Sequence, residues 1–197
     1  MSLTTQTRPA PAAARPLRRF TVGEYYAMAA AGILKREDRV ELIDGYLFAM
    51  SPIGIRHAAC VLRLNRLFSR AVDPQAFVNV QNPVRLSNRS EPEPDLALLV
   101  PKDAYEARHP RADDVLLLVE VSETTFAFDR DVKLPLYALE GIREVWIVAL
   151  EEDVVYAYRG PTDEGFAEAR TLRRGEQIGV EAMPDVPPFA VNDILGA

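Results

Sequence analysis

The sequence has almost none of the residues that build disulfides or zinc sites. It contains one cysteine, Cys60, and two histidines, so an intrachain disulfide is impossible and no Cys/His cluster suggests zinc. Cys60 lies in a helical apolar pattern, which favours a place in the core over a catalytic role. A chain without disulfides fits a reducing compartment, and we therefore expect a cytoplasmic protein.

Long apolar runs are also missing. No stretch reaches the length that a transmembrane helix needs, so we expect no membrane partner. Residues 1–18 are rich in proline, alanine and arginine and contain no apolar block, which argues against a secretory signal peptide. We expect residues 1–18 to form a flexible N-terminal tail and residues 19–197 to form one domain.

The chain has no excess of positive charge, since its formal net charge is −6. A protein that binds duplex DNA is usually basic on at least one face, so this balance weakens a nucleic-acid interpretation without excluding it. Arg63, Arg66 and Arg70 share a helical neighbourhood, and Arg85 and Arg89 flank a loop. These arginines could form local basic patches, or they could be ordinary solvated surface charges.

The patterns that are present predict helices alternating with strands. Thr21 and Glu24 have the spacing of a capping box, so a helix is expected from there to about Ala31, ending at Gly32. Apolar residues at helical spacing predict a second helix over 57–71. A third helix is expected to begin near Asp129, after a loop at 122–128.

The strand signals begin with a hairpin. Asp44-Gly45 between the strand-like runs 39–43 and 46–50 is the strongest short hairpin signal in the chain. Hairpins combined with helices that separate buried strands favour one α/β domain with a mixed sheet. Further strands are expected at 77–86, 95–100, 115–121, 144–150, 154–158 and 166–172, with a polar loop at 87–94 and a charged loop or short helix at 101–114.

One charged residue interrupts a strand that should be buried. Glu120 lies in the apolar run 115–121, which otherwise resembles a strand buried on both faces. A buried carboxylate must be neutralised, paired or bound to a cation, because leaving it charged and alone costs too much free energy. The candidate partners are Asp95, at the start of the preceding buried strand, and Lys133, in the first turns of the next helix.

This trio has the chemistry of a metal-dependent nuclease. If their strands are adjacent, Asp95 and Glu120 can converge on one divalent cation, with water and substrate phosphate completing an octahedron around Mg²⁺. The ammonium of Lys133 could position the attacking water and offset developing charge. Asp129, Lys133 and Tyr137 are spaced four residues apart and share one helix face.

Each candidate also has an ordinary structural alternative. Asp95 could cap the start of a strand after proline, and Lys133 could form a surface ion pair with Asp129. Glu41, just before the hairpin turn, could be an exposed strand position. His57 could be structural, as lone histidines commonly are.

Several short motifs occur in a characteristic order along the chain. They are VELIDG at 40–45, MSP at 50–52 with His57, QNP at 81–83, EPEPD at 91–95, EV at 120–121, DR at 129–130 with KLPLY at 133–137, and EVWIV at 144–148. Together they resemble the Uma-two family of restriction-endonuclease-like proteins, over roughly residues 20–195. The resemblance implies a single-domain α/β fold of the PD-(D/E)xK nuclease type. A central mixed β-sheet would be flanked by helices, with an additional N-terminal helix and β-hairpin.

The resemblance also implies roles for the acidic residues and the lysine. Asp95 matches the aspartate of the "PD" element, and Glu120 matches the acidic residue of "(D/E)xK". The parent pattern has its lysine two positions after Glu120, where this chain has Ser122. In this family the lysine comes from the following helix, and Lys133 matches that place. Glu41 matches an acidic position that often helps to coordinate metal or water.

We therefore expect an endonuclease that hydrolyses DNA and uses Mg²⁺ or Mn²⁺. Asp95, Glu120 and the backbone carbonyl of Val121 would hold the metal, Glu41 would complete or extend its shell, and Lys133 would orient the attacking water. The accessory candidates are His57, which matches a histidine typical of the family, and Ser122, Asp129 and Tyr137.

Two alternatives stay open, and one further expectation rests on analogy. The chain could keep the nuclease fold with little or no activity and bind nucleic acid or protein, because a fold does not establish a function. It could also act on RNA or branched DNA, although no aromatic platform supports that idea. A homodimer is expected because nucleases of this fold often pair to cut two strands.

Overall fold

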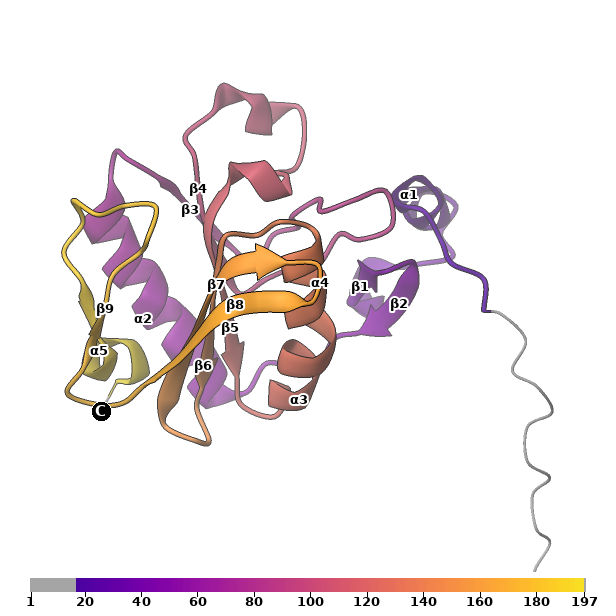
Figure 1. The fold of residues 1–197 in the computed structure, drawn as a ribbon. Helices are drawn as coiled ribbons and strands as arrows, with labels where there is room; N and C mark the ends of the chain where they lie inside the picture. The colour runs from indigo at the N-terminus through magenta and orange to yellow at the C-terminus, as the bar shows by residue number, and fades with distance from the viewer. Residues whose placement is uncertain (1–16, 197) are drawn as a thin grey trace, which may run out of the picture.

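The centre of the molecule is a six-stranded mixed sheet with the strand order β3-β4-β5-β6-β7-β8 (Figure 1). The computed structural model describes residues 17–196, so most of the tail expected at 1–18 lies outside the described residues. Strands β5 and β6 are parallel and every other neighbouring pair is antiparallel, which agrees with the predicted mixed sheet. The strands are β3 (Phe77–Val80), β4 (Leu96–Leu99), β5 (Val115–Ser122), β6 (Glu144–Ala149), β7 (Val154–Thr162) and β8 (Gly165–Leu172).

Helices cover both faces of this sheet and create two apolar cores. On one face, α2 (Ile55–Val72) packs its side chains Leu64 and Phe68 against strand residues such as Trp146. The C-terminal segment joins this layer through β9 (Gln177–Ile178), β10 (Phe189–Ala190) and α5 (Val191–Leu195). On the other face, α4 (Leu134–Leu139) contributes Tyr137 to the second core.

The N-terminal helix and the hairpin form as the sequence predicts. Helix α1 (Val22–Ala30) begins with the Thr21–Glu24 capping box. Strands β1 (Val40–Ile43) and β2 (Tyr46–Ala49) are joined by Asp44 and Gly45, whose φ angles are 48° and 79°. Two consecutive positive φ angles match the right-handed twist of a hairpin, and glycine adopts such an angle at no steric cost.

The strand expected at 77–86 is less than half its predicted length. It ends at Val80, because Gln81 has a φ angle of 49° and Pro83 has no N–H group to continue a ladder. A loop therefore runs from Gln81 back to β4, and the 101–114 segment contains the short 3₁₀ helices η2 (Asp103–Glu106) and η3 (Ala112–Asp114). A further 3₁₀ helix, η1 (Arg36–Asp38), precedes the hairpin.

The third helix begins earlier than predicted and is irregular. The loop expected at 122–128 is shorter, because β5 includes Ser122 and α3 (Phe126–Phe128) already forms a turn. The π-helical turn η4 (Asp129–Lys133) follows and runs directly into α4, where Pro135 stands in the first turn. Proline interrupts the hydrogen bonding of the preceding turn, and π-turns often occur at functional sites.

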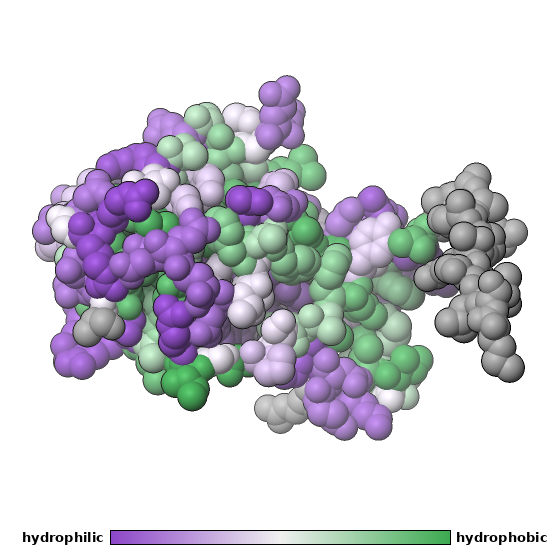
Figure 2. Space-filling model, turned by 90° about the horizontal axis from the view of Figure 1, so that it is seen from below, coloured by the Kyte–Doolittle hydropathy of each residue, from purple (hydrophilic) through white to green (hydrophobic). Residues whose placement is uncertain are grey.

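On the face that Figure 2 shows, the surface differs between the two ends of the molecule. Figure 2 shows mostly hydrophilic side chains over the end that holds the C-terminal segment, and apolar side chains gather toward the other end in the same view. No helix within residues 17–196 combines the length and apolar character needed to cross a membrane.

Candidate active site

The pairing of β4 with β5 brings Asp95 and Glu120 together. Leu96 lies opposite Val119 in the antiparallel register, so the residues beyond that pair, Asp95 and Glu120, face each other. The backbone N–H of Asp95 is 3.4 Å from Glu120 Oε2, and the N–H of Val121 donates to Asp95 Oδ2 at 2.9 Å. The two strands thus form one acidic site, as expected if they are adjacent.

Lys133 and Tyr137 reach this site from the irregular helix. Lys133 Nζ lies 3.3 Å from Glu120 Oε1 and 3.1 Å from Glu41 Oε1. The hydroxyl of Tyr137 donates to Glu120 Oε1 at 2.5 Å. Lys133 is only 5% exposed and Glu41 4%, so neither the surface ion pair nor the exposed strand position considered from sequence describes them.

Glu41 holds Lys133 from the hairpin side. One of its carboxylate oxygens contacts Lys133, and the other accepts a hydrogen bond from the backbone N–H of Glu93 at 3.2 Å. Both oxygens of Glu41 are therefore engaged by donors of this chain. Its position connects strand β1, the loop before β4 and the helix that carries Lys133.

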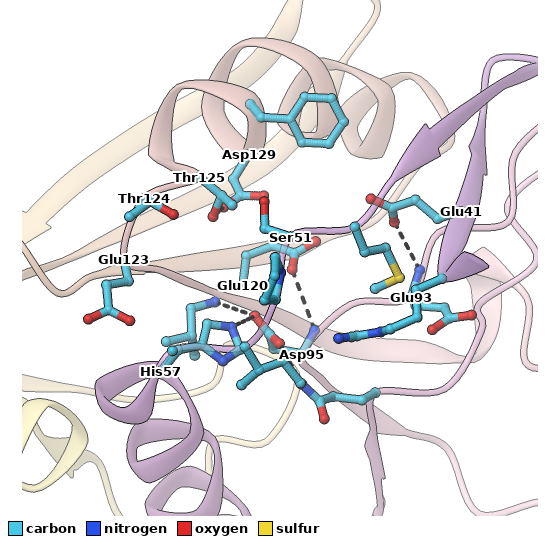
Figure 3. Close-up of a pocket in the computed structure, with 18 of the residues that line it drawn as sticks. Glu41, Ser51, His57, Glu93, Asp95, Glu120, Glu123, Thr124, Thr125 and Asp129 are labelled. Carbon is cyan, nitrogen blue, oxygen red and sulfur yellow. Dashed lines mark hydrogen bonds and ion pairs between the residues drawn. The ribbon is translucent and has the colours of Figure 1, made fainter. Parts of the chain in front are cut away.

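His57 and Gln81 hold the carboxylate of Asp95. His57, in the first turn of α2, places Nε2 3.0 Å from Asp95 Oδ2, and Figure 3 shows the ring pointing at that carboxylate. Gln81 Nε2 donates to Asp95 Oδ1 at 3.1 Å. The hydrogen bond with Asp95 raises the pKa of His57, although burial opposes it. His57 Nδ1 is buried and has no hydrogen-bond partner within the described part of the chain.

Asp129 is held by two hydroxyl groups at the side of the site. Ser122 Oγ and Thr125 Oγ1 donate to Asp129 Oδ2 at 2.7 and 2.6 Å. Ser122, which stands where the parent pattern has a lysine, is therefore a hydrogen-bond donor to a buried acid. Sequence reasoning missed Thr125 and Gln81. Their only signals were the spacing of four residues from Thr125 to Asp129 and the place of Gln81 in the QNP motif.

Most of these residues, but not Ser122 or Tyr137, line a pocket of about 340 Å³ between the hairpin, the start of α2 and the turn before η4 (Figure 3). Carboxylates outnumber cations along its wall. The acidic lining residues are Glu41, Glu93, Asp95, Glu120, Glu123 and Asp129, and the lysine and arginine lining residues are Lys133 and Arg39. A cation entering this pocket would therefore be attracted by unbalanced negative charge.

The electrostatics of the pocket centre on Glu120 and Lys133. Burial raises the pKa of Glu120 to about 8, although Lys133 opposes the shift. Burial alone would lower the pKa of Lys133, but Glu120, Glu41 and Asp129 outweigh it and raise that pKa. Lys133 therefore remains a charged ammonium group, and Glu120 is a carboxyl group that a cation would keep ionised.

The oxygen donors of the pocket suit a hard divalent cation. Mg²⁺ and Mn²⁺ prefer carboxylate, carbonyl and water oxygens, and Asp95 and Glu120 present such oxygens side by side. Within residues 17–196, no three side chains among His, Cys, Asp and Glu group closely enough to hold a metal by themselves. A metal here would need further ligands from the backbone, water or substrate.

Comparisons with known proteins agree with this fold. A solved structure titled as a "putative nuclease belonging to DUF820 from Anabaena variabilis" matches with a TM-score of 0.69. At 14% identity the match covers 89% of this chain and 97% of that one, so it supports the shared fold. No curated protein matches the chain. The model of the Uma2 family, described as "Putative restriction endonuclease", matches residues 22–190. The chain therefore belongs to the Uma2 family of restriction-endonuclease-like proteins.

Proposed function

We propose that this protein is a metal-dependent endonuclease that hydrolyses phosphodiester bonds in DNA. One observation carries the proposal: Asp95, just before β4, and Glu120, on the adjacent β5, meet beside the buried Lys133 in a pocket with a surplus of carboxylates. Membership of a nuclease family supports the same reaction type. We further propose that the protein works as a homodimer, since nucleases of this fold often pair to cut two strands, and that it acts in the cytoplasm.

The metal would be Mg²⁺ or Mn²⁺, held by Asp95, Glu120 and the backbone carbonyl of Val121. The N–H of Val121 points at Asp95, and the N–H and C=O of one residue in an extended strand face the same edge. The carbonyl of Val121 would therefore face the same edge as Asp95. A divalent cation at such a site supplies Lewis acidity, which polarises the phosphate and lowers the pKa of a bound water. His57 and Gln81 would keep the Asp95 carboxylate correctly oriented.

Lys133 would orient the attacking water and stabilise the negative charge that develops on the phosphate. Its ammonium group is buried and charged, and it lies between the carboxylates of Glu41 and Glu120. Glu41 would position Lys133, which is a different role from the metal-shell role suggested by the resemblance. Tyr137 would hold Glu120, and Asp129 would hold the turn that leads to Lys133 through its bonds to Ser122 and Thr125.

The second candidate is a nuclease-fold protein without activity that binds nucleic acid or another protein. It is favoured by one observation, that the Asp95 carboxylate already accepts hydrogen bonds from Val121, Gln81 and His57. Such a carboxylate could be purely structural. The two candidates differ in whether a metal competes for Asp95.

Calorimetric titration with Mn²⁺, followed by plasmid cleavage in Mg²⁺, distinguishes them. The wild type is expected to bind Mn²⁺ and nick the plasmid, and Glu120→Ala and Asp95→Ala are expected to lose both properties. Asp163→Ala removes an exposed carboxylate in the β7–β8 turn and serves as the matched control, so it should keep both. Metal binding unchanged in Glu120→Ala would place the metal elsewhere, and a wild type that neither binds Mn²⁺ nor nicks the plasmid would favour the second candidate.

A further inference from the structure

Helix α2 is a basic element in an acidic protein. Its charged residues are Arg56, Arg63, Arg66 and Arg70, and it contains no aspartate or glutamate, whereas the whole chain has a net charge of −6. Its opposite face, with Leu64 and Phe68, is buried against the sheet. An 18-residue helix with charges of one sign concentrates positive charge in one place on the surface.

The four arginines lie on one side of the helix. Arg56, Arg63 and Arg70 follow one another at intervals of seven residues, which is close to two full turns, and Arg66 stands one turn before Arg70. We call this set the arginine row. All four members therefore fall within one sector of the helix surface, away from the apolar core.

Two members of the arginine row are used by the fold. Arg56 pairs with Glu151 and donates to the carbonyl of Leu150. Arg63 donates to the carbonyls of Ile194 and Leu195 at 3.1 and 3.0 Å, which caps the end of α5. Arg66 and Arg70 are exposed and form no ion pair or side-chain hydrogen bond with residues 17–196. They are free to meet a partner.

The arginine row starts at the candidate active site. His57, which contacts Asp95, stands in the first turn of α2, and Arg66 and Arg70 lie roughly 14 and 20 Å farther along the helix axis. The pocket itself is rich in carboxylates and would repel a polyanion that carries no metal. Attraction for such a substrate must therefore come from the surface next to the pocket.

We propose that Arg66 and Arg70 bind the sugar-phosphate backbone of duplex DNA on one side of the cleaved bond, so that α2 guides the substrate into the pocket. The inference rests on the proposed function, because it names the substrate surface that serves the same site. Charge complementarity supports DNA as the occupant, since two unpaired guanidinium groups on an exposed helix match phosphate oxygens in charge and geometry. Both residues would contact the sugar-phosphate backbone of DNA, so binding would not depend on base sequence.

Fluorescence anisotropy with a labelled 24-base-pair duplex, in EDTA to prevent cleavage, tests this surface. The comparison is between wild type, Arg66→Gln/Arg70→Gln, and the control Arg170→Gln/Arg173→Gln. The control removes two exposed arginines of the β8 region that also form no ion pair with described residues. Circular dichroism melting checks that all three proteins are folded.

The α2 variant is expected to bind duplex DNA more weakly than the wild type, and its affinity should depend less steeply on salt. Two lost phosphate contacts should reduce the slope of log K against log[salt] by about two. The difference in affinity between wild type and variant should therefore shrink about tenfold from 50 to 200 mM salt. The control should bind with the wild-type affinity and slope.

Three other outcomes would overturn the proposal. They are equal loss of affinity in both variants, no loss in the α2 variant, and a wild type that binds no duplex at all. Leu62 is 70% exposed on the same side of α2, and its substitution tests a different occupant, a second copy of the chain. A dimer that dissociates in Leu62→Glu, together with unchanged DNA affinity in the α2 variant, would assign this face to that second copy.

Plasmid cleavage separates this inference from the proposed function. Wild-type cleavage with an unaffected α2 variant would refute the role of α2 and leave the nuclease proposal standing. DNA binding that depends on Arg66 and Arg70 without any cleavage would support the role of α2 and refute the nuclease proposal.

Discussion

A buried carboxylate lies at each end of strand β5, and the two have opposite kinds of surroundings. Asp114 immediately precedes the strand and is 1% exposed, and Glu120 lies near its far end and is 3% exposed. Asp114 is bound by Lys102, by Arg108 at 2.7 Å and by the N–H of Arg111 at 2.9 Å. Glu120 shares its single lysine with Glu41.

The difference appears in the pKa values. Burial alone would raise the pKa of Asp114, but the hydrogen bonds from Arg108, Lys102 and Arg111 outweigh it and hold that pKa well below its usual range. Burial raises the pKa of Glu120 to about 8, and the nearby carboxylates of Asp129 and Asp95 add to the shift. A carboxylate surrounded by donors strengthens the fold, whereas one surrounded by other carboxylates is suited to a cation or to chemistry.

The largest effect is expected for catalysis at Glu120. Glu120→Gln should reduce plasmid cleavage by at least about a thousandfold, because the amide cannot replace a charged metal ligand. The free energy of unfolding should change by less than about 1 kcal/mol, since the amide can still accept from Tyr137 and Lys133 keeps Glu41. Plasmid cleavage and urea denaturation measure the two quantities. Retained cleavage would remove Glu120 from the chemistry.

Asp114 is expected to show the reverse behaviour. Asp114→Asn should lower the free energy of unfolding by about 2 to 3 kcal/mol, because it weakens hydrogen bonds to two cations at a buried position. Cleavage by the folded variant should be unchanged, since Asp114 does not line the pocket. Urea denaturation at pH 7 tests the first expectation. A loss of activity larger than the loss of folded protein would show that Asp114 also supports catalysis, which contradicts the contrast between the two ends of β5.

The contribution of Asp114 should also depend on pH in a defined direction. Its folded pKa is below the unfolded value of about 3.9, so the folded state binds fewer protons there. The stabilisation is therefore present above that unfolded value and is lost as pH falls toward the folded pKa. The difference in unfolding free energy between wild type and Asp114→Asn should shrink from pH 6 to pH 2. A constant difference would show that charge contributes nothing.

The smallest effect is expected for a partner of Asp114. Lys102→Gln should cost less than about 1 kcal/mol of unfolding free energy, because the Lys102 side chain is 40% exposed and Arg108 and Arg111 still bind the carboxylate. Thermal unfolding beside the Asp114→Asn variant gives the comparison. A cost equal to that of Asp114→Asn would mean that Lys102 alone holds the carboxylate.

Much of the fold followed from local patterns. The Thr21–Glu24 capping box and the Asp44-Gly45 turn involve residues close in sequence, so their signals survive without tertiary structure. The strand expected at 77–86 failed at Gln81, whose positive φ serves its bond to Asp95. That bond is a tertiary contact, and no alternation of apolar residues could reveal it.

The candidate site also contains residues that local patterns revealed and residues that they did not. Glu120 could be found because a carboxylate in an apolar run conflicts with burial. The positions of Asp95 and Lys133 along the chain then pointed to them as partners, and the motif order agreed. The hydrogen bond from Gln81 and the support of Asp129 by Thr125 were not predicted, since neither residue interrupts a pattern. The loop expected at 122–128 hid the turn of α3 that carries the chain toward Lys133.

The sequence alone determined most local elements, the continuous apolar run that buries β5 on both faces, and the conflict at Glu120, because these depend on the side chains of neighbouring residues. Only the tertiary structure decided that Glu41 and Tyr137 would meet Glu120 and Lys133, and that His57 would meet Asp95. Those contacts join residues from the hairpin, two helices, the π-helical turn, strand β5 and the position just before β4. They depend on how the helices and the hairpin pack against the sheet, which the sum of the local patterns does not specify.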